Sequence, residues 1–250
     1  MHRIYLPKKA IADGRAAIVG AQAHKVTHVL RLTPGDELLA SDGRGTDFVL
    51  RIERIGPDLV SCKILATKEP QSAETRNQIV LMQCCLSSAK MDQVIDRTTQ
   101  LGASRFVPVA SEKSKFRGEG SRIKSKVERW YRIAQAAALQ SGRAVFPIVE
   151  PITPLRKALD LPSHADRRLL FSPYADAESA CDVLPKLLSD LNQGEAVYLL
   201  LGPEAGFSEA ENRAAVRCRF TPVRTGLRTL RAETAPIVAL TLVLYHLEEL

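Results

Sequence analysis

From residue 78 onward, short apolar runs alternate with longer segments in which apolar residues recur at helical spacing. The runs that predict buried strands are 79–86, 105–110, 168–171 and 196–201. The segments that predict helices are 90–101, 123–141, 176–191 and 208–217. Parallel strands need long crossover connections, which are usually helices, so this alternation is typical of a parallel sheet covered by helices. The sequence therefore predicts an α/β domain over residues 76–250.

The preceding residues show a different pattern, with short runs separated by tight turns. The tetrapeptide Asp42-Gly43-Arg44-Gly45 is a strong turn signal between two of these runs. The run 47–55 alternates apolar and charged residues, as a half-buried strand does. These features predict a small β-barrel over residues 1–70. The polar segment 67–76 contains a proline and is the best candidate for a linker.

The net charge of +7 and the pI of about 9.3 favour a polyanionic partner, although charge also serves solubility. No run reaches the roughly 20 apolar residues that cross a bilayer, and the N-terminus lacks the apolar core of a signal peptide. We therefore expect a cytoplasmic protein with no membrane partner. The five cysteines form no C-x-x-C pair, which argues against a disulfide framework. Apart from a lone His24/His28 pair, the histidines lack metal-ligand spacing, so no metal is expected.

The first candidate site follows the apolar run that ends at Leu201. The loop Gly202-Pro203-Glu204-Ala205-Gly206-Phe207 comes next, and Ser208 with Glu211 then matches a capping box that begins a helix. Such a loop lies at the carboxyl edge of a parallel strand, where open α/β sheets bind ligands. An ordinary strand-to-helix loop would look the same, so both interpretations stay open on this evidence.

The second candidate site is the segment 226–236, which follows a predicted strand at 220–224. Thr234 is suited to an N-cap, with Pro236 early in the first turn of the last helix. Arg228, Arg231 and Glu233 lie in the loop before that helix. They could form the rim of an active site or a structural cluster of ion pairs.

The third feature is a basic stretch over residues 113–132, with eight basic and two acidic side chains. Its first part follows a strand and contains Gly118 and Gly120, which favour a flexible loop. A basic loop at the edge of a catalytic face suits contacts with RNA phosphates. The alternative is a solvated helix face.

The final helix is apolar around most of its surface, so it must be buried on several sides. Its apolar residues are Ile237, Val238, Leu240, Leu242, Val243, Leu244 and Leu247. Burial within one subunit and burial in a homodimer interface both satisfy this pattern.

Two motifs resemble those of the RsmE-type family, the 16S ribosomal RNA uracil N3-methyltransferases of the SPOUT class. They are Gly202-Pro203-Glu204-Ala205-Gly206-Phe207-Ser208-x-x-Glu211 and Leu230-Arg231-Ala232-Glu233-Thr234-Ala235. The resemblance extends along nearly the whole chain. Further matching segments are His2-Arg3-Ile4-Tyr5, Val29-Leu30-Arg31-Leu32-x-Pro34-Gly35-Asp36, Lys90-Met91-Asp92, Leu101-Gly102 and Gln140-Ser141-Gly142-Arg143.

The resemblance implies an N-terminal PUA-like barrel and a C-terminal SPOUT domain with a trefoil knot. It implies that S-adenosylmethionine is the cofactor, that 16S rRNA or the small ribosomal subunit is the substrate, and that the protein is a homodimer. The residues expected to hold the cofactor are Leu201, Gly202, Pro203, Glu204, Gly206, Gly226, Thr229, Leu230 and Arg231.

Methyl transfer to uracil N3 requires that N3 lose its proton and that the base be accessible. We expect Arg231 to stabilise the uracil anion or a nearby phosphate. We expect Glu233 to orient Arg231 or to assist removal of the proton. The residues expected to contact RNA are Arg31, Lys113, Lys115, Arg117, Arg122 and Lys124.

The chain departs from the family pattern at several positions. Ala205 replaces a usual glycine, which would cost on the order of 1 kcal/mol if that position needs a positive φ. Thr229 stands where an aliphatic residue is usual. Two alternatives therefore accompany N3 methylation. One is a ribose 2′-O-methyltransferase of the same class, and the other is a non-catalytic RNA-binding protein associated with the ribosome.

Overall fold

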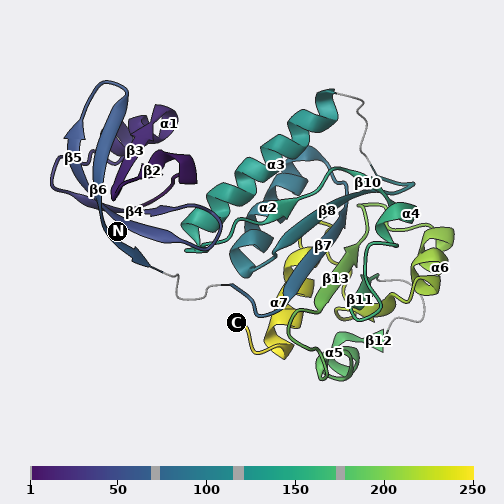
Figure 1. Cartoon of the computed structure of the whole chain (residues 1–250). Coiled ribbons are helices and arrows are strands. Elements are labelled where there is room, and N and C mark those ends of the chain that lie inside the picture. Colours follow the sequence, from purple (N-terminus) through teal and green to yellow (C-terminus); the bar gives the residue numbers. More distant parts are fainter. Residues whose placement is uncertain (1, 69–73, 115–120, 173–177) are drawn as a thin grey trace. The chain divides into compact units, whose positions relative to one another are not determined.

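The computed structural model describes residues 2–68, 74–114, 121–172 and 178–250 (Figure 1). The chain forms two compact units. The first comprises Met1–Glu74 and Ala138–Phe146, and the second comprises Thr75–Ala137 and Pro147–Leu250. The predicted domain boundaries at residues 70 and 76 stay a prediction. The segment 138–146 belongs to the first unit, although the sequence-based division placed it in the second domain.

The first unit is built on a curled six-stranded sheet, a half-barrel in which the order is β1-β4-β5-β6-β3-β2. All its neighbouring strands are antiparallel except β1 and β4. The strands are β1 (Arg3–Tyr5), β2 (Ile11–Ala12), β3 (Arg15–Val19), β4 (Glu37–Ser41), β5 (Asp47–Ile55) and β6 (Leu59–Lys68). The predicted β-rich N-terminal domain is thereby confirmed.

A helical segment interrupts this sheet, which the sequence analysis did not predict. A short 3-10 helix, η1 (Lys8–Ala10), lies between β1 and β2. Helix α1 (Gly20–His24) continues directly into a π-helical turn, η2 (Lys25–Val29). Only Ala23 and Val26 of α1 and η2 are buried, so too few apolar positions repeat to give a helical signal.

The segment 138–146 packs against the N-terminal sheet. Phe146 donates its backbone N–H to the carbonyl of Gly43, and its ring would lie within 2.3 Å of a Cβ at Gly43. Gly43 has a φ of +70°, so glycine is required there by both conformation and space. The buried guanidinium of Arg143 pairs with Glu74 at 2.6 Å. These contacts explain why the segment belongs to the first unit.

The second unit contains an eight-stranded sheet with the order β10-β8-β7-β13-β11-β14-β12, and β9 pairs with β8. Every described pairing in this sheet is parallel, as the sequence predicts. The central strands are β7 (Gln78–Cys84), β8 (Arg105–Ala110), β11 (Arg167–Phe171), β13 (Ala196–Leu201) and β14 (Thr221–Arg224). The short outer strands are β9 (Ile148–Val149), β10 (Thr153–Pro154) and β12 (Glu178–Ser179).

Helices cover both faces of this sheet. On one face, buried residues of α2 (Ser88–Leu101), α3 (Ser121–Gln140), α5 (Ala180–Leu188) and α7 (Ala235–His246) form a continuous core with the strands. On the other face, α4 (Leu155–Ala158) and α6 (Glu209–Arg217) pack over a second core. The sheet is therefore buried on both sides, which explains the continuous apolar runs of its strands.

The predicted helix at 176–191 is wrong at its start. Glu178 and Ser179 form β12, which pairs with β14, and the helix α5 begins only at Ala180. Pairing with a neighbouring strand overrode the local pattern, as tertiary context often does. The trefoil knot implied by the family resemblance stays a prediction.

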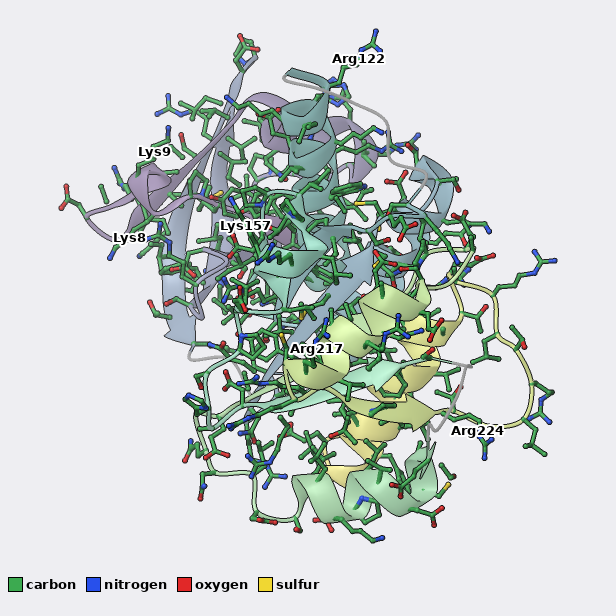
Figure 2. All side chains as sticks on the ribbon, turned by 90° about the vertical axis from the view of Figure 1, so that its right-hand side faces the viewer. Lys8, Lys9, Arg122, Lys157, Arg217 and Arg224 are labelled. Atoms are coloured by element: carbon green, nitrogen blue, oxygen red, sulfur yellow. The ribbon has the colours of Figure 1, made fainter. Side chains whose placement is uncertain are left out.

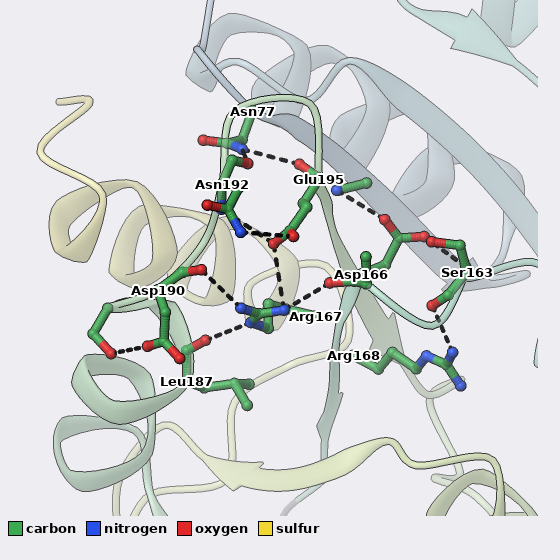
Figure 3. Close-up of polar contacts among 12 residues, drawn as sticks. Asn77, Ser163, Asp166, Arg167, Arg168, Leu187, Asp190, Asn192 and Glu195 are labelled. Atoms are coloured by element: carbon green, nitrogen blue, oxygen red, sulfur yellow. Dashed lines mark hydrogen bonds and ion pairs between the residues drawn. The ribbon is translucent and has the colours of Figure 1, made fainter.

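A polar network ties together the amino ends of three strands in the second unit (Figure 3). Arg167 pairs with Glu195 at 3.4 Å and donates to the carbonyls of Leu187 and Asp190. The side-chain amide of Asn77, just before β7, donates to the carbonyls of Asn192 and Glu195. This edge of the sheet is thus closed by structural contacts, and the opposite edge carries the candidate site.

Within the described residues, no helix is long and apolar enough to cross a membrane.

Candidate active site

The loop after β13 forms a tight turn at the carboxyl edge of the sheet. Gly206 donates its backbone N–H to the carbonyl of Pro203 at 2.9 Å, and its φ is +67°. A Cβ at Gly202 would lie 3.1 Å from the ring of Phe207. The glycines therefore allow the loop to fold closely on itself, with Leu201, Pro203 and Phe207 buried and Ala205 exposed.

Ala205 causes no backbone strain in this turn. It is absent from the described non-glycine residues with a positive φ, which are Asp13, Arg31, Arg219 and Glu248. The cost that a positive φ would have imposed on alanine does not arise. The predicted capping box is confirmed directly after the turn, because Ser208 and Glu211 each accept a hydrogen bond from the other's backbone.

The loop before α7 leads into an unusual helix start. The carbonyl of Arg231 accepts hydrogen bonds from the backbone N–H groups of Thr234 and Ala235. Thr234 is the N-cap as predicted, but its side chain makes no capping hydrogen bond. Gly226 has a φ of +143°, and Thr229 and Arg231 are exposed. The loop therefore presents polar groups at the same edge of the sheet.

Lys90 brings the two loops together. It lies in the first turn of α2, and its Nζ is 3.5 Å from Oε1 of Glu204 and 3.2 Å from Oε2 of Glu233. The side chains of the two glutamates are 16% and 13% exposed, and that of Lys90 is 34% exposed. Three segments that are far apart in the sequence thus converge on one cation.

The surroundings of Glu233 favour its ionised form. A hydrogen bond from its own backbone N–H lowers the pKa of the Glu233 carboxyl below its usual value, and Lys90 and the positive charge of Arg231 lower it further. Oε2 of Glu204 is buried and has no hydrogen-bond partner among the described residues, whereas the buried Oε2 of Glu233 is the oxygen that faces Lys90 at 3.2 Å. The unpaired oxygen of Glu204 could accept a hydrogen bond from a bound molecule.

Gln83 holds the beginning of the first loop. Its side-chain amide donates to the carbonyl of Gly202 at 3.1 Å and to that of Cys84 at 2.9 Å. Gln83 lies opposite Leu201 in the register of β7 and β13, so the two strands end side by side. This contact fixes the position at which the loop leaves the sheet.

The described members of the predicted RNA-contacting set are all exposed: Arg31 in the first unit, and Lys113, Arg122 and Lys124 in the second. Figure 2 shows the side chain of Arg122 extending away from the start of α3. Nζ of Lys113 lies 3.5 Å from the carbonyl of Phe207, so the basic stretch begins beside the first loop. Lys115 and Arg117 lie outside the described residues.

A pocket of about 690 Å³ lies beside the first loop, on the α6 side of the sheet. Its lining includes the apolar residues Leu170, Phe207 and Pro222 and the cations Lys113 and Arg213. The first loop contributes Ala205 and Phe207 to this pocket, but none of the residues predicted to hold the cofactor lines it.

The structure therefore places Glu204 and Glu233 together and puts Arg231 near them, whereas Thr229 extends into solvent. Lys90 is not among the site residues predicted from the sequence. Lys90 follows the first strand of the α/β domain at the same edge of the sheet, and that position is the signal that could have identified it. Among the described residues, no group of three or more possible metal ligands converges.

Comparison with known proteins gives two domain matches. The RNA methyltransferase domain matches residues 73–244, and the RNA methyltransferase PUA domain matches residues 20–65. The chain is 26% identical to the ribosomal RNA small subunit methyltransferase E of Bacillus subtilis, covering 98% of this chain and 96% of that protein. It is 30% identical to the protein of the same name in Aquifex aeolicus, covering 81% of this chain and 82% of that protein.

Solved structures agree with these matches. A methyltransferase of Legionella pneumophila, in complex with the cofactor SAM, superposes with a TM-score of 0.86 at 26% identity over 97% of this chain and 96% of that one. The ribosomal RNA small subunit methyltransferase E of Neisseria gonorrhoeae, bound to S-adenosyl methionine, has a TM-score of 0.84 at 28% identity over 98% and 97% of the two chains. The chain thus carries both domains along its length, and it belongs to the RsmE-type family of RNA methyltransferases.

Proposed function

We propose that the protein uses S-adenosylmethionine to methylate N3 of a specific uridine in 16S ribosomal RNA. Family membership supports RNA methylation, and the names of the relatives support the small-subunit RNA as substrate. The observation that carries the proposal is the convergence of the 202–207 loop and the 226–234 loop on Lys90. Because the substrate is ribosomal RNA, the activity belongs to the cytoplasm.

The residues at this edge of the sheet fit the proposed cofactor. S-adenosylmethionine carries a sulfonium and an ammonium group, and the buried, unpartnered Oε2 of Glu204 suits positive charge and hydrogen-bond donors. Gly202 leaves room for the ring of Phe207 and Gly206 supplies the positive φ of the turn, so both glycines shape the loop that is proposed to receive the cofactor. Leu201, Pro203, Gly226, Thr229 and Leu230 complete the proposed adenosine-binding set. The cofactor supplies the electrophilic methyl group.

Arg231 is proposed to stabilise the uracil anion or an adjacent phosphate, because its guanidinium is exposed at the end of the loop. Glu233 has two candidate roles, orientation of Arg231 and removal of the N3 proton. Its lowered pKa makes it a weak base, since proton abstraction is most effective when the pKa of the base lies near the working pH. We therefore favour the orienting role.

The RNA is proposed to contact Arg31 and the basic stretch that begins at Lys113. The net charge of +7 supports phosphate binding, and Lys113 lies beside the cofactor loop. Exposed cations at the start of α3 would hold the backbone while the target base enters the site.

A homodimer is proposed from the surface of α7. Ala239, Leu240, Val243 and Leu244 are buried within the subunit, but Ile237, Val238 and Leu242 are only partly covered. An apolar helix that remains partly exposed favours coverage by a second copy of the chain.

The decisive experiment incubates small ribosomal subunits and free 16S rRNA, in separate reactions, with the protein and labelled S-adenosylmethionine. Nucleoside mass spectrometry then identifies the product, and mapping locates it. We expect N3-methyluridine at a single position. A 2′-O-methylated nucleoside would replace the proposal with ribose methylation. No product, with no cofactor binding by calorimetry, would support a non-catalytic RNA-binding protein.

A further inference from the structure

Lys90 provides both candidate loops with a cation that comes from a third segment of the chain. Glu204 follows β13, Glu233 precedes α7, and Lys90 comes from α2. Its ammonium group is within 3.5 Å of a carboxylate oxygen on each loop. Among the ion pairs of the described residues, no other lysine contacts two acidic side chains.

Two carboxylates that approach a shared point repel each other, and the repulsion strengthens as water is removed. The side chains of Glu204 and Glu233 are largely buried, so solvent screens them poorly. Lys90 offsets both charges with one cation. Without it, the two loops would have to separate or take up protons.

Exposed salt bridges contribute little to stability, but this one differs in two respects. The two carboxylates are largely buried, and Oε2 of Glu204, the oxygen that does not face Lys90, has no hydrogen-bond partner among the described residues. Lys90 therefore holds both glutamates in place, and Glu204 keeps one buried oxygen that no described protein donor satisfies. A carboxylate that is fixed and unsatisfied is well prepared to bind a ligand.

We propose that Lys90 is a positioning residue that clamps the 202–207 loop to the 226–234 loop and so sets the geometry in which the cofactor binds. The clamp itself is a property of the ligand-free chain. Its effect on cofactor affinity rests on the function proposed above.

The test compares Lys90→Met and Lys90→Arg with the unaltered protein. Arg97→Met is the matched control, because Arg97 is an exposed cation on the same helix. Backbone hydrogen exchange of the two loops is measured without ligand, and the Kd for S-adenosylmethionine is measured by calorimetry. Lys90→Met should speed exchange in both loops and weaken binding about tenfold, which corresponds to about 1.4 kcal/mol. Lys90→Arg should recover part of the affinity, and Arg97→Met should match the unaltered protein.

Lys90→Met with exchange and Kd both unchanged would overturn the clamp. Equal weakening by Lys90→Arg and Lys90→Met would overturn its electrostatic basis. If Lys90→Met does not fold, Glu204→Gln tests the clamp in its place. This variant removes the charge that Lys90 pairs with on the 202–207 loop and keeps the ion pair between Lys90 and Glu233. Faster exchange confined to the 202–207 loop is then expected, and unchanged exchange there contradicts the proposal. If the unaltered protein methylates no RNA, the proposed function fails while the exchange data still decide the role of Lys90.

Discussion

Ser208 and Glu211 cap each other across the first turn of α6. Oγ of Ser208 accepts the backbone N–H of Glu211 at 3.3 Å, and Oε2 of Glu211 accepts the backbone N–H of Ser208 at 2.9 Å. The other oxygen of the same carboxylate accepts the backbone N–H of Glu112 at 2.8 Å. This pair therefore anchors the end of the candidate cofactor loop to both α6 and the start of the basic stretch.

Replacing Ser208 with alanine should destabilise the protein by about 1 kcal/mol, the usual cost of losing an N-cap. Urea unfolding followed by circular dichroism measures this change. Ser125→Ala is the control, because Ser125 is exposed within α3 and caps nothing in the structure. Equal stabilities of the two variants would show that the capping box contributes nothing.

The capping box shows which parts of this fold a sequence can reveal. Strands β5 and β13 begin and end at the predicted residues, because each has its full signal within a few positions. The packing of Phe146 on Gly43 has no such local signal, since it depends on segments that meet only after folding. The same holds for the candidate site. The two loops were evident from their motifs, but Lys90 could be joined to them only in three dimensions.

Arg231→Ala should lower the methylation rate about a hundredfold or more while leaving the affinity for S-adenosylmethionine nearly unchanged. Loss of a group that stabilises developing negative charge typically costs this much, and the exposed guanidinium contributes little to the fold. Single-turnover kinetics and calorimetry separate the two effects. Arg228→Ala is the control on the same loop, where Arg228 is also exposed. Unchanged methylation by Arg231→Ala would remove this residue from the mechanism.

Ala205→Gly should not improve cofactor binding, although glycine is usual at this position in the family. Ala205 has no positive φ, so glycine relieves no strain there. Glycine only increases the conformational entropy of the unfolded chain, which destabilises the folded state. We expect a loss of about 0.4–1 kcal/mol in unfolding free energy. Gly206→Ala provides the contrast, because a φ of +67° should cost alanine about 1–2 kcal/mol. A gain in stability or affinity for Ala205→Gly would contradict this account.

Glu233 should make the stability of the protein sensitive to acid. Its pKa in the folded state is lowered from about 4.5, chiefly by the hydrogen bond from its own backbone N–H and also by Lys90. The unfolded chain therefore binds the proton more readily, and the stabilising effect is present above pH 4.5 and lost as the pH falls through the lowered pKa.

The measurement is the difference in unfolding free energy between the unaltered protein and Glu233→Gln as a function of pH. The difference should be constant near neutral pH and should shrink below about pH 4.5. Glu128→Gln, on the exposed face of α3, controls for loss of a surface charge. A difference that grows in acid would mean that the folded state raises this pKa.

The thiols should differ widely in reactivity. Burial raises the pKa of Cys62 to about 11 and that of Cys85 to about 12, and it raises the pKa of Cys84 further. Cys181 is exposed at the start of α5. The thiolate is the nucleophile, so iodoacetamide at mildly alkaline pH should modify Cys181 first in the folded protein. Peptide mass spectrometry follows the labelling, Cys181→Ser should remove the fast phase, and urea should expose all five thiols. Labelling of Cys84 or Cys85 as fast as Cys181 would show that the carboxyl end of β7 opens readily beside the candidate site.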